Sequence, residues 1–156
     1  MRSTTHLVFG AGVAGLAAAL AGCRVECWML SMLASAVANL LVDAAGHDHR
    51  LFSAPRRTRV THSLPGMTTV ALIVWWLASK STVYGGERLG LAAAVLAGTL
   101  SHWVLDSLNP SGVYIVRGRF RIARISYSNP MVNALLQVAG AVMAAYSAVL
   151  VYHGVP

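Results

Sequence analysis

The feature that most constrains this chain is a series of apolar runs with almost no charged residues. Five runs are separated by short polar segments: residues 7–22, 28–42, 64–78, 89–108 and 131–152. A helix needs about 20 mainly apolar residues to cross the hydrocarbon core of a bilayer, and the third run is short for that task. Charged residues make up 11% of the chain, whereas soluble domains have about 25%. The sequence therefore predicts one integral-membrane domain over residues 1–156, an all-α polytopic helix bundle of about five spans.

The polar stretches between the runs predict two kinds of connection. Residues 51–62, which contain a proline and several arginines, are expected to form a loop. In residues 110–130, apolar and basic side chains alternate on both sides of Arg117-Gly118-Arg119, which predicts a small basic β-hairpin between the fourth and fifth spans. Asn129 is followed by a proline and is expected to cap the last helix.

The positive charges predict the orientation of the chain in the membrane. If each run crosses once, one side receives nine arginines and the other side receives Arg24, Lys80 and Arg88. Because cytoplasmic loops carry the excess of basic residues, we expect a cell (inner, cytoplasmic) membrane protein with its N-terminus in the cytoplasm and its C-terminus outside. Arginines in such short loops are typical of contact with anionic lipid headgroups, and no nucleic acid partner is expected.

Histidines and carboxylates gather on the same predicted side. In the fourth run His102 and Asp106 stand four residues apart, so a helix places them on one face. Neutral imidazoles and carboxylates at one membrane face suit zinc or another divalent first-row metal. Six candidate ligands exceed one tetrahedral site and would suit two metals: His6, Asp43, His47, His62, His102 and Asp106.

These residues also have simpler interpretations. His102 and Asp106 could be a hydrogen-bonded pair that fixes helix packing, and His6 could bond to other protein groups within the bundle. Asp48 and His49 could be solvated loop residues. Cys23 and Cys27 could be small apolar residues, or a disulfide on an oxidising side. The common face of the histidines and carboxylates is what favours a metal site over these alternatives.

Several short motifs occur in an order that resembles a known family. They are Thr-His at 5–6, the segment 39–50, Thr-His-Ser at 61–63 and Ser-His-Trp-Val-Leu-Asp at 101–106. This order is similar to the YdjM/YbcI-type family, which is described as LexA-binding, inner-membrane-associated, metal-dependent hydrolases. Residues 112–133 look more like an archaeal relative of uncharacterised function. LexA binding would belong to bacterial relatives, and we do not extend it to this chain.

The second motif departs from the pattern of that family. The family usually has Pro-Asp-x-Asp-His there, whereas this chain has Val-Asp-Ala-Ala-Gly-His-Asp-His over residues 42–49. The ligands within that segment therefore stay open among Asp43, His47, Asp48 and His49.

The resemblance and the residues together predict a metal-dependent hydrolase at the cytoplasmic membrane face, acting on a phosphoester or lipid-linked substrate. Asp48 is the candidate general base. The substrate's negative charge would be bound by Arg50, Arg59, Ser63, Arg117 and Arg119. The alternatives are a structural metal or hydrogen-bond site with a basic face for a lipid or partner, and a metal carrier or sensor. Small residues in the first and fourth runs permit a homodimer without requiring one.

Overall fold

The computed structural model describes residues 1–48, 56–57, 60–81, 85–116 and 118–154. Five helices follow one another along the chain, with a 3₁₀ turn at Gly85–Glu87: α1 (Ser3–Leu20), α2 (Val25–Gly46), α3 (Leu64–Ala78), α4 (Arg88–Ser107) and α5 (Pro130–His153). Each helix coincides with one predicted apolar run, so the all-α prediction is confirmed.

Four of the five helices have the length and composition of membrane spans, namely α1, α2, α4 and α5. The remaining helix, α3, is apolar but has 15 residues. At 1.5 Å per residue it is about 22 Å long, which is less than the roughly 30 Å of a bilayer core. The prediction that the third run is short for a full span agrees with this length.

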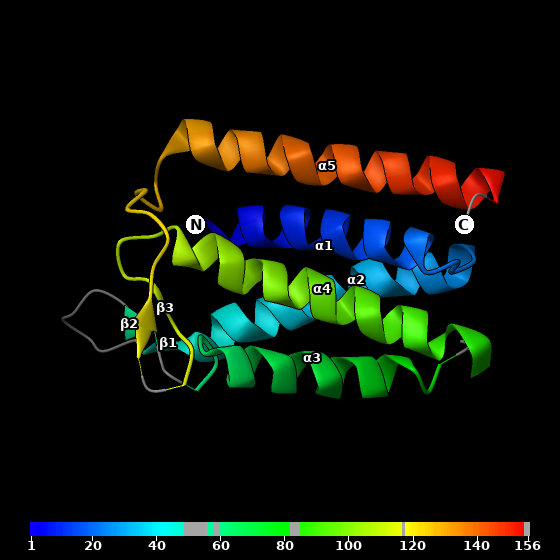
Figure 1. Cartoon of the computed structure of the whole chain (residues 1–156), viewed down its shortest axis with the longest axis horizontal. Helices are drawn as coiled ribbons and strands as arrows, with labels where there is room; N and C mark the ends of the chain where they lie inside the picture. Colours follow the sequence, from blue (N-terminus) through cyan, green and yellow to red (C-terminus); the bar gives the residue numbers. More distant parts are fainter. Residues whose placement is uncertain (49–55, 58–59, 82–84, 117, 155–156) are drawn as a thin grey trace.

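Successive helices run in opposite directions, so each end of the bundle holds one terminus of every helix (Figure 1). The first residues of α1, α3 and α5 and the last residues of α2 and α4 lie at one end, which we call the site end. The strands lie there too, and the two chain termini lie at opposite ends. The predicted common side of the histidines therefore corresponds to one end of the molecule.

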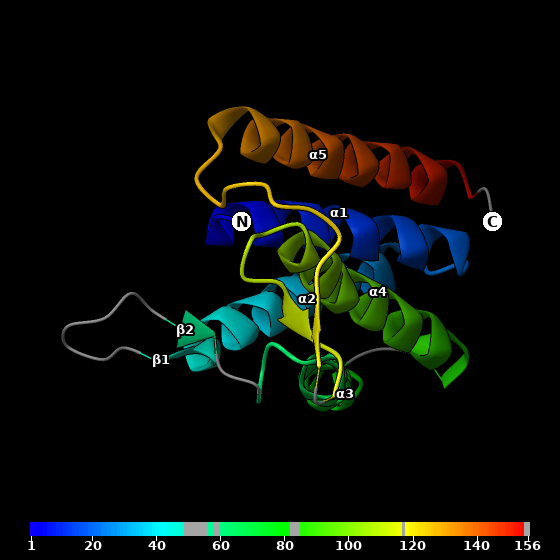
Figure 2. The same ribbon diagram turned by 60° about the vertical axis from the view of Figure 1, so that its left-hand side comes forward.

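Helix α1 is the centre of the bundle. It packs against α5 on one side and against α2 and α4 on the other, while α3 packs on α4 and α2 (Figure 2). Helices α1 and α5 touch through their backbones, because a Cβ atom on Gly140 would lie 2.6 Å from the carbonyl oxygen of Val8. Small residues at such contacts let membrane helices approach closely.

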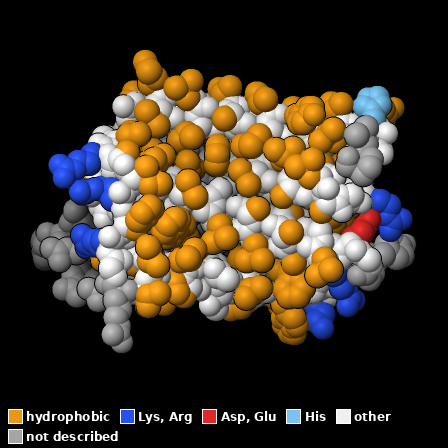
Figure 3. All heavy atoms as spheres, in the orientation of Figure 1, with side chains coloured by type: hydrophobic (Ala, Val, Ile, Leu, Met, Phe, Trp, Pro, Cys, Tyr) orange, Lys and Arg blue, Asp and Glu red, His pale blue; other side chains and the backbone are white. Residues whose placement is uncertain are grey.

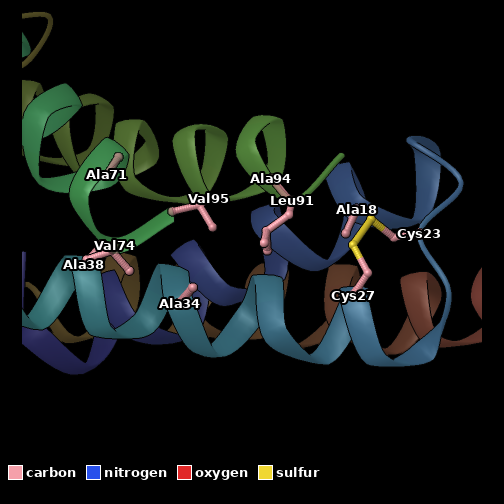
Figure 4. Close-up of a cluster of buried hydrophobic side chains, with 10 residues drawn as sticks. All are labelled: Ala18, Cys23, Cys27, Ala34, Ala38, Ala71, Val74, Leu91, Ala94 and Val95. Atoms are coloured by element: carbon pink, nitrogen blue, oxygen red, sulfur yellow. A yellow bond between two sulfur atoms is a disulfide. The ribbon is translucent and has the colours of Figure 1, made fainter. Parts of the chain in front are cut away.

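The apolar core lies away from the site end and is built mostly from small side chains of α1, α2, α3 and α4 (Figure 4). Cys23 and Cys27 belong to this cluster and form a disulfide, which decides between the two interpretations of these residues. Beside them Arg24 Nε lies 2.9 Å from Glu87 Oε1. Partial burial acts to raise the pKa of the Glu87 carboxyl, but hydrogen bonds and charge from Arg24 outweigh it and hold the pKa below its ordinary value of 4.5.

Two short antiparallel strand pairs lie at the site end. The pair of β3 (Val113–Tyr114) and β4 (Arg119–Phe120) is the predicted hairpin, with Tyr114 opposite Arg119. The pair of β1 (His47–Asp48) and β2 (Arg56–Arg57) was not expected, because residues 51–62 were predicted to be loop throughout. The sequence shows no alternation there that would signal a strand.

Side-chain caps position two helices at the site end. Ser63 Oγ accepts a hydrogen bond from the backbone N–H of Gly66 and so caps α3. Asn129 Oδ1 accepts a hydrogen bond from the backbone N–H of Val132, which confirms the predicted cap of α5.

On the face shown in Figure 3, hydrophobic side chains cover the middle, and lysines and arginines lie toward the two ends. This distribution is that of a protein whose central belt contacts lipid and whose ends meet the headgroups.

Candidate metal centre

His102 and Asp106 are delivered to the site end by the last turns of α4. Both side chains are fully buried, and His102 Nε2 lies 3.4 Å from Asp106 Oδ2. The i, i+4 spacing produces this contact directly, as the sequence predicted, because the two residues lie one above the other on the helix.

The first turn of α1 brings His6 to the same carboxylate. His6 Nε2 lies 3.1 Å from Asp106 Oδ1, and the His6 ring stacks on the ring of His102 with centroids 3.7 Å apart. His6 is therefore fixed against both members of the α4 pair.

Two further residues lie close to the α4 pair. Asp43 belongs to α2, and His62 immediately precedes Ser63, the cap of α3. Asp43 Oδ1 lies 3.5 Å from His102 Nε2 and 4.0 Å from His62 Nε2. His62 Nε2 also lies 3.7 Å from Asp106 Oδ2. Four helices or their flanking residues thus place three imidazoles and two carboxylates in one cluster: His6, Asp43, His62, His102 and Asp106.

The cluster contains two groups whose ligand atoms all lie within 4.8 Å of one another and could hold a metal ion. One is His6, His102 and Asp106, and the other is Asp43, His62 and His102. Two ligands bound about 2.1 Å from a tetrahedral zinc are about 3.4 Å apart. The separations from 3.4 to 4.0 Å among Asp43, His62, His102 and Asp106 approach that value, and nitrogen and carboxylate oxygen donors suit zinc, so the residues fit a metal.

A second set of polar side chains surrounds the cluster and contacts its members. Asn39 Oδ1 lies 3.1 Å from His102 Nδ1, and Thr61 Oγ1 lies 3.3 Å from His62 Nδ1. Asn109 Nδ2 donates to Asp106 Oδ1 at 3.0 Å. Sequence reasoning did not assign Asn39 and Asn109 to the site. Their positions in the sequence could have indicated this role, because Asn39 precedes Asp43 by one helical turn and Asn109 follows Asp106 by three residues.

Several other predicted site residues are described only in part or lie outside the described part of the structure. His47 and Asp48 form β1 directly after α2, but their side chains lie outside the described part of the structure. His49, Arg50, Arg59 and Arg117 lie outside the described residues altogether.

The two predicted substrate-binding residues that are described both contact protein groups. Ser63 caps α3, and Arg119 donates two hydrogen bonds to Tyr114 Oη at 3.1 and 2.9 Å. Tyr114 in turn donates its backbone N–H to the carbonyl oxygen of His62. The basic hairpin is therefore attached directly beside the cluster.

Comparison with known proteins identifies the family of the chain. No curated protein matches it. No solved structure matches it either. The model of the YdjM inner membrane protein family matches residues 1–155. Since this match spans nearly the whole sequence, the chain belongs to the YdjM inner membrane protein family.

Proposed function

We propose that this membrane protein is a metal-dependent hydrolase whose site lies at the cytoplasmic membrane face. The observation that carries the proposal is the meeting of four atoms from three parts of the fold, namely α2, the residue before the α3 cap, and α4: Asp43 Oδ1, His62 Nε2, His102 Nε2 and Asp106 Oδ2. Carboxylates and histidines inside a membrane bundle are expensive to bury, so a cluster of five favours a functional role.

We assign one divalent ion, most simply zinc, to these four atoms. His102 belongs to both possible metal groups, and an imidazole nitrogen has one lone pair, so His102 Nε2 serves a single ion. In this assignment His6 holds the other oxygen of Asp106, Oδ1, which Asn109 also contacts. The group of His6, His102 and Asp106 is the competing position for the ion.

A zinc ion held by these residues would supply an activated water as nucleophile and Lewis-acid polarisation of a phosphoryl oxygen. The chain itself would supply the groups that bind the substrate and move its protons. Asp48 follows α2 at the site end and is our candidate general base. Arg50, Arg59, Arg117, Arg119 and Ser63 are the candidates for binding a phosphoester, free or on a lipid-linked substrate.

The first test is the metal content of the purified protein. We expect close to one equivalent of zinc or another transition metal in the wild type, and strong losses in His62→Ala and Asp106→Ala. His153→Ala is the matched control, because His153 is exposed and closes α5 at the opposite end. Less than about 0.2 equivalents in wild type purified without chelators would overturn the metal site.

The second test is turnover. We expect the metal-loaded protein to hydrolyse a member of a panel of soluble and lipid-linked phosphoesters, and Asp106→Ala to lose that activity with its metal. A protein that keeps its metal but hydrolyses none of the panel would contradict the hydrolase assignment.

A structural metal site is the second candidate function, and one observation favours it. His62, His102 and Asp106 are fully buried, and structural zinc sites are closed whereas catalytic sites keep an open position. Asp43, with 15% of its side chain exposed, is the member of the cluster that reaches the surface. A structural site predicts that metal removal lowers the melting temperature and that no substrate is turned over.

A further inference from the structure

Asn39 is a buried asparagine of α2, one helical turn before Asp43, and it contacts the ring nitrogen of His102 that faces away from the carboxylates. Its Oδ1 atom lies 3.1 Å from His102 Nδ1, and the residue is 1% exposed. An asparagine in a membrane helix either serves as a contact between helices and nothing more, or it also orients a neighbouring side chain. The hydrogen bonds of its amide group decide between the two.

The amide nitrogen of Asn39 is directed toward backbone acceptors. Nδ2 donates to the carbonyl oxygen of Ser35 at 3.0 Å and to that of Gly98 at 3.3 Å. Turning the amide over would place Oδ1 against these two carbonyl oxygens, which cannot donate. The Ser35 hydroxyl, 3.4 Å from Nδ2, already donates its hydrogen to the carbonyl oxygen of Gly10. The oxygen of Asn39 is therefore the atom that faces His102.

This orientation sets the tautomer of His102. An amide oxygen only accepts hydrogen bonds, so the 3.1 Å contact requires the proton of the neutral imidazole on Nδ1. Nε2 then carries the lone pair. That nitrogen is buried, makes no hydrogen bond within the described part of the chain, and lies 3.4 Å from Asp106 and 3.5 Å from Asp43.

Backbone packing makes the place that Asn39 occupies. A Cβ atom on Gly10 would collide with Asn39 Nδ2, and one on Gly98 would collide with Ser35 Oγ and with the carbonyl oxygen of Gly10. Helices α1 and α4 thus lack side chains where the α2 amide crosses between them. The space, the two acceptors and the position of His102 all fix the amide in one orientation.

We propose that Asn39 is a positioning residue that holds His102 in the Nδ1-protonated tautomer, so that Nε2 is presented to the metal. Because this inference rests on the metal site of the proposed function, one measurement must test Asn39 without a metal. Residues that orient a ligand histidine usually change metal affinity by about 10–100-fold when they are lost.

The metal-independent experiment is ¹⁵N NMR of the histidine side chains in the metal-free protein at a pH of about 8, which is above the range in which free histidine titrates. The His102 signals are assigned by their absence in His102→Gln. We expect an Nδ1-protonated ring in the wild type and a mixture of tautomers in Asn39→Leu or in the smaller Asn39→Ala. A wild-type His102 that carries its proton on Nε2 would overturn the proposal without any variant.

The metal-dependent experiment is a Zn²⁺ titration against a chromophoric chelator. We expect Asn39→Leu and Asn39→Ala to bind zinc about 10–100-fold more weakly than the wild type. Asn39→Asp keeps an oxygen beside His102 Nδ1 and should retain most of the affinity, although it loses stability because its second oxygen faces the two carbonyls.

Ser35→Ala is the matched control. Ser35 Oγ donates to the carbonyl oxygen of Gly10 in the same buried layer. Its loss should lower the melting temperature and leave zinc affinity unchanged. Equal losses of zinc affinity in Ser35→Ala and Asn39→Leu would mean that Asn39 acts only through helix packing. A wild type that binds no zinc but shows the expected tautomer would contradict the proposed metal site and support the orienting role of Asn39.

Discussion

At the scale of single residues, three members of the cluster each contact a neutral polar side chain that lies outside the cluster. Asn39 contacts His102, Thr61 contacts His62 and Asn109 contacts Asp106. Such contacts orient ligand groups and reduce the freedom that they lose on binding. His6 differs, because its contacts are the Asp106 carboxylate and the His102 ring themselves.

Because of this difference, substitutions of His6 and of His62 should affect metal binding differently, which tests the position of the ion. Glutamine at position 6 can still donate a hydrogen bond to Asp106 Oδ1. Glutamine at position 62, in contrast, lacks the imidazole nitrogen that would bind the metal. We expect His6→Gln to keep its metal and His62→Gln to lose at least about 100-fold in zinc affinity, more than is usual for a supporting residue. Metal titration of both variants measures this. A loss in His6→Gln together with metal retained in His62→Gln would place the ion in the group of His6, His102 and Asp106.

At the scale of the elements, the site depends on how closely the helices pack. Helix α1 carries His6 and is held against α5 by a backbone contact at Gly140. Near the site end Thr5 Oγ1 donates to Asn133 Oδ1 at 2.7 Å, which ties the first turn of α1 to α5. Displacing α5 from α1 would therefore disturb both the fold and the support of His6.

We expect Gly140→Leu to destabilise the protein by about 1–3 kcal/mol, the usual cost of overpacking a close contact. The added side chain would meet the backbone of Val8 and Phe9, which cannot give way. Ala141→Leu is the control, because Ala141 is the next residue of α5 and is exposed. Thermal unfolding in detergent compares the two. Equal melting temperatures would mean that α1 and α5 do not pack through Gly140.

At the scale of the whole molecule, the two ends differ in chemistry. The site end holds the histidine–carboxylate cluster and the basic hairpin, and the opposite end holds the Cys23–Cys27 disulfide and the Arg24–Glu87 ion pair. The arginines predict that the opposite end faces outside the cell, and a disulfide persists on such an oxidising side.

Accessibility of introduced cysteines tests this orientation. Ser126 is exposed at the site end and Ser81 is exposed in the turn after α3, at the opposite end. We expect a membrane-impermeant thiol reagent to label Ser81→Cys in intact cells and Ser126→Cys only after the cells are opened. The disulfide leaves Cys23 and Cys27 unreactive. The reverse pattern of labelling would invert the topology.

Particular residues show why part of the site was predictable. His102 and Asp106 meet because they are four residues apart on one helix, and that rule needs no tertiary structure. Asp43 and His62 could be assigned to the same end from the alternation of the helices. Their atomic contacts with His102 could not, because they depend on how α2, α3 and α4 are rotated about their axes, and small residues on several faces of these helices leave that rotation undetermined.

Other features carried too weak a signal in the sequence. Asn39 reads as an ordinary polar residue near the end of an apolar run. Its role depends on Gly10 of α1, which leaves room for its amide, and on the carbonyl oxygen of Gly98 in α4, which accepts from it. Strands β1 and β2 have two residues each, which is too short to show the repeated alternation of apolar and polar residues that reveals a strand.

The sequence by itself determined five apolar helices, the short length of the third, the basic hairpin and the end of the bundle at which histidines and carboxylates gather. Hydropathy and helical periodicity are local properties, and they decide which segments form helices and which end of each helix is polar. Only the tertiary structure decided which atoms meet, that Asn39 faces His102 through its oxygen, and that Cys23 is joined to Cys27. Those contacts depend on helix rotation and close approach, which are properties of packed neighbours rather than of any one segment.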